Sequence, residues 1–229
     1  TSYNTVSGLQ NLHDATGTLA YNTAFGYQNG YSSTAAQNAT LIGRQNGMNS
    51  TNISGSTLIG WRNMHSTTGN VGYNFIIGYG NLYYPTTSMT QNVVMGFQNS
   101  YNSTDVDYTT MFGYRNGYNV GNLDYSTLIG RENGYSSSSI SYSTMSGLYN
   151  AKNVNSTITD SALFGRQNAM NGYDIQYSII SGYDNAKESE YIRNSAAFGR
   201  ENAKNATQFQ NSFASGYQNL YTTATDVNY

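Results

Sequence analysis

The chain has 229 residues, of which 10% are charged, and its formal net charge is −2 at pH 7. This balance provides no strongly basic or acidic face, so nucleic acid and anionic membranes are not expected as partners. The sequence contains no cysteine, which excludes a disulfide framework and a thiolate metal site. No stretch approaches about 18 consecutive apolar residues, so we expect no membrane insertion by this chain.

One glycine recurs along the whole chain at intervals of 17 or 18 residues. The repeat glycines are Gly8, Gly26, Gly43, Gly60, Gly78, Gly96, Gly113, Gly130, Gly147, Gly165, Gly182, Gly199 and Gly216. Three residues after each stands an asparagine, namely Asn11, Asn29, Asn46, Asn63, Asn81, Asn99, Asn116, Asn133, Asn150, Asn168, Asn185, Asn202 and Asn219. Thirteen matches in thirteen units identify a tandem repeat, which we interpret as a single domain over residues 1–229. Positions are numbered below from the repeat glycine, so the asparagine stands at +3.

Twelve of the thirteen units begin with an apolar residue at position −7. This column contains Leu19, Ala36, Ile53, Val71, Met89, Val106, Leu123, Ile140, Ile158, Ile175, Ile192 and Phe209. The second apolar column, at position −2, contains Val6, Ala24, Leu41, Leu58, Ile76, Val94, Met111, Leu128, Met145, Leu163, Ile180, Ala197 and Ala214. The residues before each glycine are rich in β-branched side chains and tyrosine, which favours strands.

The two columns lie five residues apart, an odd offset that a straight strand would send to opposite faces. Either the chain turns a corner between them or the sheet is buried on both sides, and a corner fits a coil. One unit alone cannot bury both columns, whereas stacked units can. We therefore predict an all-β fold, a parallel β-solenoid or β-roll of thirteen coils, associated laterally with copies of itself. A rise of about 4.8 Å per coil gives a rod of roughly 60 Å.

The glycine and the asparagine are interpreted as architecture rather than as a ligand site. We expect the glycine to adopt a positive φ where the coil turns. The asparagine either stacks into an amide ladder, which we favour, or adopts a left-handed or turn-capping conformation. The segment after the asparagine varies in length, as in Tyr83–Thr87, and is predicted to be an outward loop. Substitution of Ser137 or Ser138 in this loop is expected to be nearly silent.

The unit from Asn22 to Tyr31, N-T-A-F-G-Y-Q-N-G-Y, resembles a known family of repeats. It is similar to the head repeats of trimeric autotransporter adhesins and, more closely, to the N-T-A-I-G-Y-Q-A-L repeats of bacterial surface proteins and phage tail fibres. The resemblance covers essentially the whole chain through short motifs. It implies a parallel β-roll, usually of three chains side by side, in an extracellular fibre that contacts receptors. The period here is longer than in the adhesins, and asparagine replaces a small residue after the glycine.

Position −1 neighbours a buried column and should therefore point outward, where residues such as Phe25, Ile59 and Phe164 suggest a contact between chains. A second internal layer is the equal alternative. In the C-terminal half the units alternate. Those with Ile129, Phe164 and Phe198 carry arginine at +1, at Arg131, Arg166 and Arg200. Those with Ser146, Ser181 and Ser215 carry Leu148, Tyr183 and Tyr217 there. This alternation indicates either interdigitating neighbours or duplication of a two-unit block.

Aromatic columns at +1 and +5 are candidates for stacking on sugar rings. The predicted glycan contacts are Tyr27, Trp61, Tyr79, Tyr114, Tyr183 and Tyr217. The alternative is that these rings cover the edge of the core or a partner chain. Six N-x-[ST] sequons are possible glycosylation sites, at Asn38, Asn49, Asn52, Asn102, Asn155 and Asn205.

The residues needed for catalysis are scarce. His13 and His65 occupy equivalent positions three coils apart and are interpreted as surface replacements for tyrosine. Two carboxylate pairs, Asp107 with Asp124 and Asp184 with Glu201, are equivalent in successive units and about 5 Å apart if coils stack. Such pairs suit polysaccharide cleavage or a hard cation. No second cluster supports either role, so we expect neither an enzyme nor a bound cofactor or metal.

These observations predict a structural or adhesive segment of an extracellular fibre, on a cell or virion surface. The expected partners are copies of the chain, in a lateral trimer or an end-to-end fibre, and cell-surface glycans or receptors. The alternative is an ice-binding solenoid, because threonine recurs at position −3. This column contains Thr5, Thr23, Thr40, Thr57, Thr110, Thr127 and Thr144, and it is interrupted by Phe75, Val93, Ala162, Ile179, Ala196 and Phe213.

Overall fold

The computed structural model describes residues 3–153, 157–170, 174–186, 188, 193–202, 211 and 213–219. The chain divides into two compact units, Thr1–Tyr114 and Arg115–Tyr229. The described residues are all-β with no helix, and parallel strands stack as a β-solenoid, as predicted. They therefore contain no helix long and apolar enough to cross a membrane. The predictions at Asn155, Ile192, Asn205 and Phe209 lie outside the described residues, as do the side chains of Ile158 and Ile175.

The described chain forms about 11 turns of about 17 residues, slightly fewer than the thirteen units counted in the sequence. A turn runs from one glycine strand to the next, and parts of the C-terminal coils lie outside the described residues. Every repeat glycine nevertheless lies in a strand. In the first unit these are β1 (Thr5–Leu9), β3 (Thr23–Tyr27), β5 (Thr40–Arg44), β6 (Thr57–Trp61), β8 (Phe75–Tyr79), β10 (Val93–Phe97) and β12 (Thr110–Tyr114). In the second unit they are β14 (Thr127–Arg131), β16 (Thr144–Leu148), β18 (Ala162–Arg166), β20 (Ile179–Tyr183), β21 (Ala196–Arg200) and β22 (Phe213–Tyr217).

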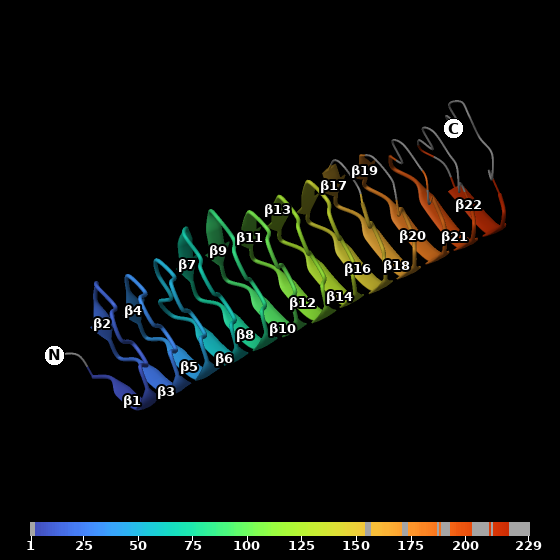
Figure 1. Cartoon of the computed structure of the whole chain (residues 1–229). Coiled ribbons are helices and arrows are strands. Elements are labelled where there is room, and N and C mark those ends of the chain that lie inside the picture. The colour runs from blue at the N-terminus through green and yellow to red at the C-terminus, as the bar shows by residue number, and fades with distance from the viewer. Residues whose placement is uncertain are drawn as a thin grey trace. The chain divides into compact units, whose positions relative to one another are not determined.

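A shorter strand around position −7 precedes most glycine strands and belongs to a separate sheet. The first unit contains β2 (Leu19–Ala20), β4 (Ala36–Gln37), β7 (Asn70–Gly72), β9 (Ser88–Thr90) and β11 (Asp105–Asp107). The second contains β13 (Asn122–Asp124), β15 (Ser139–Ser141), β17 (Thr157–Thr159) and β19 (Ile175–Gln176). Figure 1 shows β2, β4, β7 and β9 on the side of the first unit opposite β3, β5, β8 and β10.

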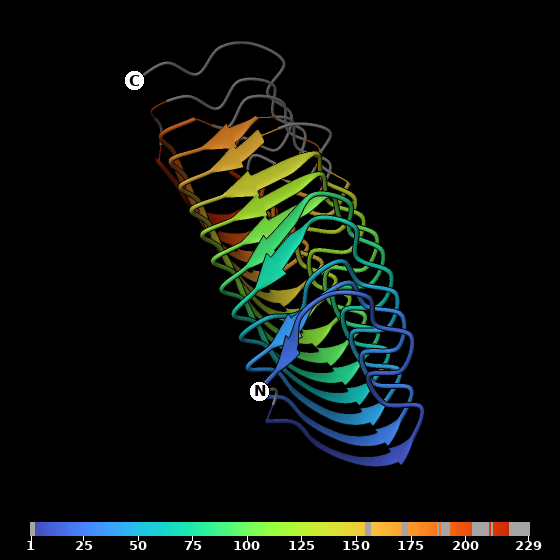
Figure 2. The ribbon, with the colours of Figure 1, turned by 90° about the vertical axis from the view of Figure 1, so that its left-hand side faces the viewer.

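Neighbouring coils pair in parallel and in exact repeat register, so equivalent residues lie directly above one another. Gly26 pairs with Gly43, for example, and Leu41 with Leu58. Figure 2 shows the glycine strands of the first unit as a ladder of successive rungs. Any side chain that recurs at one position is therefore stacked into a column along the unit.

The two predicted apolar columns form the core. At position −2, Leu41, Leu58 and Ile76 are fully buried, and so are Ile53 and Leu123 at position −7. Val6, on the first strand, is the exception at 45% exposure, because β1 pairs on one side only.

The corner between the two columns is made by a residue with positive φ at position −5. This residue is tyrosine in several coils, with φ of 58° at Tyr73 and 51° at Tyr142. Such a conformation is uncommon for a bulky side chain. The corner therefore exists as predicted, but the sequence did not reveal which residue forms it.

The repeat glycine has a positive φ, as expected, and close contact with the adjacent coil also excludes any side chain at this position. Gly130 has a φ of 121°, and a Cβ placed on it would lie 2.0 Å from the carbonyl oxygen of Gly147. The backbones of adjacent coils thus approach more closely at this position than any side chain allows.

The segment after the asparagine is only partly an outward loop, which corrects the prediction. Position +4 is buried at Met64 and Leu82, and position +7 is buried at Ser50 and Ser137. Ser137 Oγ donates a hydrogen bond to the carbonyl oxygen of Ala151, at 3.2 Å. Small polar residues point inward here because a hydroxyl satisfies the carbonyl of the neighbouring coil. The tolerance expected for Ser137 was therefore wrong, whereas Ser138 is exposed as predicted.

The asparagines at +3 stack as a ladder, the interpretation favoured from the sequence. Asn133 Nδ2 donates to Asn116 Oδ1 at 3.1 Å, and Asn150 Nδ2 donates to Asn133 Oδ1 at the same distance. The same side-chain nitrogen, Asn133 Nδ2, also donates to the carbonyl oxygens of Ile129 and Gly147, at 2.8 and 3.0 Å. Each asparagine thus ties its own glycine strand to the coils on both sides.

A second, unpredicted polar ladder occupies position −4, inside the corner. Asn92 Nδ2 donates to Asn74 Oδ1 at 3.0 Å and to the carbonyl oxygen of Val106 at 2.7 Å. In the second unit serine replaces asparagine, and the backbone N–H of Ser143 donates to Ser126 Oγ at 3.1 Å. Serine or asparagine recurs before the strand in the sequence, but these residues are equally common in turns, so the pattern alone did not predict a ladder.

Candidate functional site: the outer face of the glycine strands

The outer face of the glycine strands is formed by positions −3 and −1, which alternate with the buried position −2. In β8, Ile76 is fully buried whereas Phe75, one residue before it, is 41% exposed. In β18, Leu163 is fully buried and Phe164 is 40% exposed. Position −1 therefore points outward, as expected, and it forms no second internal layer in the described strands.

This face is uncharged, and large apolar residues stand on it among threonines and serines. Neither position carries an acidic or basic residue in any of the thirteen units. The exposed large apolar side chains on the face are Phe25, Ile42, Phe75, Val93, Ile129, Phe164, Ile179, Phe198 and Phe213. We call these two columns the apolar stripe.

From β18 onward, large and small residues alternate in both columns of the stripe. Phe198 at −1 lies beside Ala196 at −3, and in the next coil Phe213 at −3 lies beside Ser215 at −1. The rings of Phe198 and Phe213 are 5.8 Å apart and tilted by 46°. A large side chain in one column therefore leans towards a small one in the next coil, which favours the interdigitation suggested by the sequence.

The neighbouring column at +1 consists of aromatic rings and guanidinium groups, except at Leu9 and Leu148. In the first unit the Arg44 guanidinium lies 5.6 Å from the Tyr27 ring and 5.2 Å from the Trp61 ring. Tyr79 then packs against the edge of Trp61 at 4.9 Å and stacks on Phe97 at 5.0 Å. These contacts stabilise the coil stack along its length.

The alternation of arginine and tyrosine in the second unit has the same explanation. The guanidinium groups of Arg166 and Arg200 each lie 5.3 Å from the Tyr183 ring, and Arg200 lies 5.5 Å from the Tyr217 ring. An arginine between two rings makes a cation–π contact with each, and it keeps like charges apart by one coil.

The predicted glycan contacts all belong to this +1 column. Arg166 and Arg200 flank the Tyr183 ring, whereas Trp61 and Tyr79 meet edge-on with their planes 77° apart. Neighbours in the column therefore occupy part of the ring surface that a sugar would need. Glycan binding by Tyr27, Trp61, Tyr79, Tyr114, Tyr183 and Tyr217 stays a prediction.

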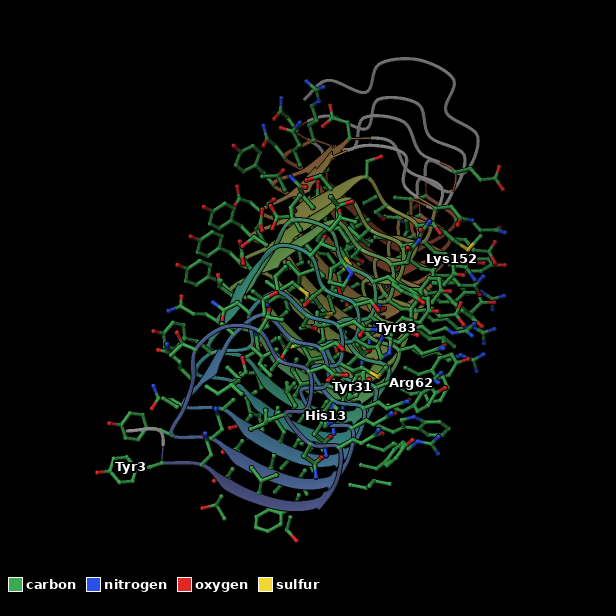
Figure 3. The ribbon with its side chains drawn as sticks, turned by 60° about the vertical axis from the view of Figure 1, so that its left-hand side comes forward. Tyr3, His13, Tyr31, Arg62, Tyr83 and Lys152 are labelled. Atoms are coloured by element: carbon green, nitrogen blue, oxygen red, sulfur yellow. The ribbon has the colours of Figure 1, made fainter. Side chains whose placement is uncertain are left out.

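Rings also stack along position +5, in two groups separated by Met48, and each group contains one histidine. His13 stacks on Tyr31 at 5.7 Å, and His65 stacks on Tyr83 at 4.9 Å, so both replace tyrosine as predicted. Figure 3 shows His13, Tyr31, Arg62 and Tyr83 on one side of the first unit, away from Tyr3. His65 is buried rather than on the surface, which corrects the prediction. Burial, aided by the charge of Arg62, lowers the pKa of His65 to about 4.

One carboxylate of each predicted pair is engaged with neighbouring groups other than its pair member. Asp107 Oδ1 accepts hydrogen bonds from the backbone N–H and hydroxyl of Thr90, at 2.6 and 2.7 Å. Glu201 accepts from Arg200 at 3.2 Å and from Gln218 at 3.2 Å. In the described residues no group of three or more histidine, aspartate or glutamate side chains could hold a metal ion.

Three of the predicted glycosylation sites, Asn38, Asn49 and Asn102, are exposed. Asn52 is half-buried, and its Oδ1 accepts hydrogen bonds from the backbone N–H of Ser54 at 3.0 Å and from the Ser54 hydroxyl at 2.6 Å. Modification of Asn52 would break this small turn, so the first three sites are sterically favoured.

The fold and the columns define a tandem-repeat β-solenoid with one apolar outer face. No protein-family model, curated protein or solved structure matches this chain.

Proposed function

We propose that the chain is a structural segment of an extracellular fibre in which copies associate laterally through the apolar stripe. The observation that carries the proposal is the uncharged outer face, where large apolar side chains are exposed in coil after coil. Contiguous apolar surface of this kind marks an interaction site in soluble proteins. Burying it against a partner removes that area from water, the main driving force of association.

A second copy of the chain is the partner that fits best. The stripe repeats with the spacing of the coils, and a copy presents the same residues at the same spacing. Phe164 and Phe198 alternate with Ser181 and Ser215 at position −1, so a large side chain of one copy can fill the space beside a small one of another. Symmetric self-association of such a face also gives closed oligomers, such as the trimer that the resemblance implies.

Sedimentation velocity at micromolar concentration tests this proposal. We expect the wild type to sediment as an oligomer and the double variant Ile129→Ser, Phe164→Ser to sediment as a monomer. Serine occupies position −1 in alternate coils, so the substitutions are compatible with the strand. Tyr142→Ser is the matched control, because Tyr142 is exposed at the corner and lies outside the stripe. A monomeric wild type, or a variant that associates as well as the wild type, would contradict lateral association through the stripe.

Ice binding remains the second proposal because threonines face outward in successive coils. Thr23, Thr40 and Thr57 are in register at position −3, as a threonine array on ice requires. Phe75 and Val93 interrupt the array in the next two coils, which favours the fibre. Thermal hysteresis of the purified chain distinguishes the two functions.

A further inference from the structure

A column of polar side chains at position +2 runs between the two aromatic stacks of the first unit. Gln28 donates to Gln10 and Gln45 donates to Gln28, both at 2.9 Å, and the Arg62 Nε donates to Gln45 at 2.8 Å. Gly80 follows Arg62 in this column and has no side chain to continue it. The column is therefore interrupted in one coil.

The interruption leaves a cavity of about 70 Å³ that is partly open to solvent. Its walls are Arg62, Tyr79, Gly80, Tyr83, Gln98 and Tyr101. A Cβ placed on Gly80 would meet nothing closer than the Gln98 Cγ, at 3.6 Å, so the backbone leaves room for a larger residue here. The space results from the choice of glycine and not from a constraint of the fold.

Arg62 brings a positive charge to this cavity without a carboxylate to balance it. The only acidic residues in the described part of the first unit are Asp14, Asp105 and Asp107, and none forms an ion pair with Arg62. Its Nε is bonded to Gln45 and its guanidinium lies 5.6 Å from the Trp61 ring. In the described chain neither Nη group donates to a protein acceptor, so both are available to a ligand.

The remaining walls are flat and neutral at physiological pH. Tyr83 and Tyr101 stack at 4.9 Å with their planes 8° apart, and Tyr83 is only 8% exposed. Burial and a hydrogen bond to Tyr84 raise the pKa of Tyr83 to about 12, so its hydroxyl stays protonated. His65, next in the same stack, stays neutral because its pKa is lowered to about 4. The site therefore carries a single positive charge, that of Arg62, among polar and aromatic groups.

We propose that the cavity beside Gly80 binds a carboxylate group, with Arg62 as its charged partner. A carboxylate is planar, matches the two Nη groups of a guanidinium and receives charge-assisted hydrogen bonds from them. About 70 Å³ admits such a group but not a whole sugar ring, so the rest of the ligand lies outside, against the exposed edges of the aromatic stacks. The carboxylate comes either from a free small acid or from an acidic saccharide. This proposal does not depend on lateral association.

Titration calorimetry on the full chain tests the site with three probes. These are sodium acetate, a uronic-acid oligosaccharide and a neutral oligosaccharide of the same ring type. We expect acetate to bind weakly, the acidic oligosaccharide to bind more tightly, and the neutral oligosaccharide not to bind at this site. Binding of acetate alone assigns the site to a free small acid, whereas tighter binding of the oligosaccharide assigns it to an acidic saccharide. If neither acid binds to the wild type, the proposal is overturned.

Two variants locate the binding. Gly80→Gln rebuilds the polar column and fills the cavity, and it suits the backbone because φ is 60° at Gly80 and 54° at Gln45. Arg62→Gln removes the charge but keeps the residue type found at this position in the preceding coils. We expect each variant to weaken binding by about tenfold or more. Arg131→Gln, the same charge change at an exposed arginine of the second unit, should have no effect. Unchanged affinity in Gly80→Gln, with the thermal midpoint preserved, would show that the cavity is not the site.

Discussion

At the scale of single residues, the ladder asparagines combine a small size with complete hydrogen bonding. Asn133 is fully buried, and its side chain donates to Asn116, Ile129 and Gly147 while accepting from Asn150. An unsatisfied polar group in such a position costs far more than a satisfied one contributes. Asparagine therefore recurs because equivalent partners recur in successive coils.

Replacing Asn133 by alanine should lower the free energy of unfolding by about 3 kcal/mol or more, because several buried groups lose their partners at once. Urea unfolding monitored by circular dichroism measures the change. Asn122→Ala is the control, since the Asn122 side chain is exposed and should contribute little. Equal stability of the two variants would show that the ladder contributes nothing to the fold.

The buried His65 makes stability dependent on pH. Its folded-state pKa of about 4 lies below the ordinary 6.5, so the unfolded chain binds the proton more readily. The free energy of unfolding that depends on neutral His65 is therefore fully present above pH 6.5, and it is lost as the pH falls towards 4. His65→Tyr, which introduces the residue found at this position in the next two coils, should remove this part of the acid sensitivity. Thermal midpoints of the wild type and His65→Tyr, measured between pH 6.5 and 4, test this prediction. If both midpoints fall equally with pH, His65 is not the source of the acid sensitivity.

At the scale of the elements, the apolar columns at −2 and −7 were predictable because leucine, isoleucine and valine have an unambiguous preference for the interior. The inward positions −4, +4 and +7 were not, since serine, asparagine and alanine occur equally in turns. The corner at Tyr73 was also hidden, because the preference of tyrosine for strands argues against a positive φ. In the folded chain, pairing of equivalent residues in adjacent coils decides these positions instead of the local preference of each residue.

The corrected inward positions give a graded prediction for one coil. Leu128→Asp should cost several kcal/mol, because a buried charge has no partner. Ser137→Ala should cost about 1 kcal/mol through loss of its bond to Ala151, and Ser138→Ala should stay within about 0.5 kcal/mol of the wild type. Urea midpoints rank the three variants. Equal tolerance of Leu128→Asp and Ser138→Ala would refute the inward and outward faces.

At the scale of the whole molecule, the apolar stripe was visible in the sequence only as one of two equal alternatives. A large side chain at position −1 reads the same on an outer face and in a second layer, and only the strand geometry places Phe25 and Phe164 outside. The cavity at Gly80 was not predicted, because a glycine at position +2 in one of thirteen coils carries no signal until the neighbouring rings are in place.

Lateral association of copies of the chain is tested most directly by small-angle X-ray scattering of the purified protein. We expect the forward scattering to give a particle mass that is a small multiple of 25.1 kDa. We also expect a maximum dimension close to the roughly 60 Å that thirteen coils would span, because the copies add side by side. The Ile129→Ser, Phe164→Ser variant should keep this length and scatter as one chain. A compact, globular profile, or a wild type with the mass of a single chain, would contradict the account.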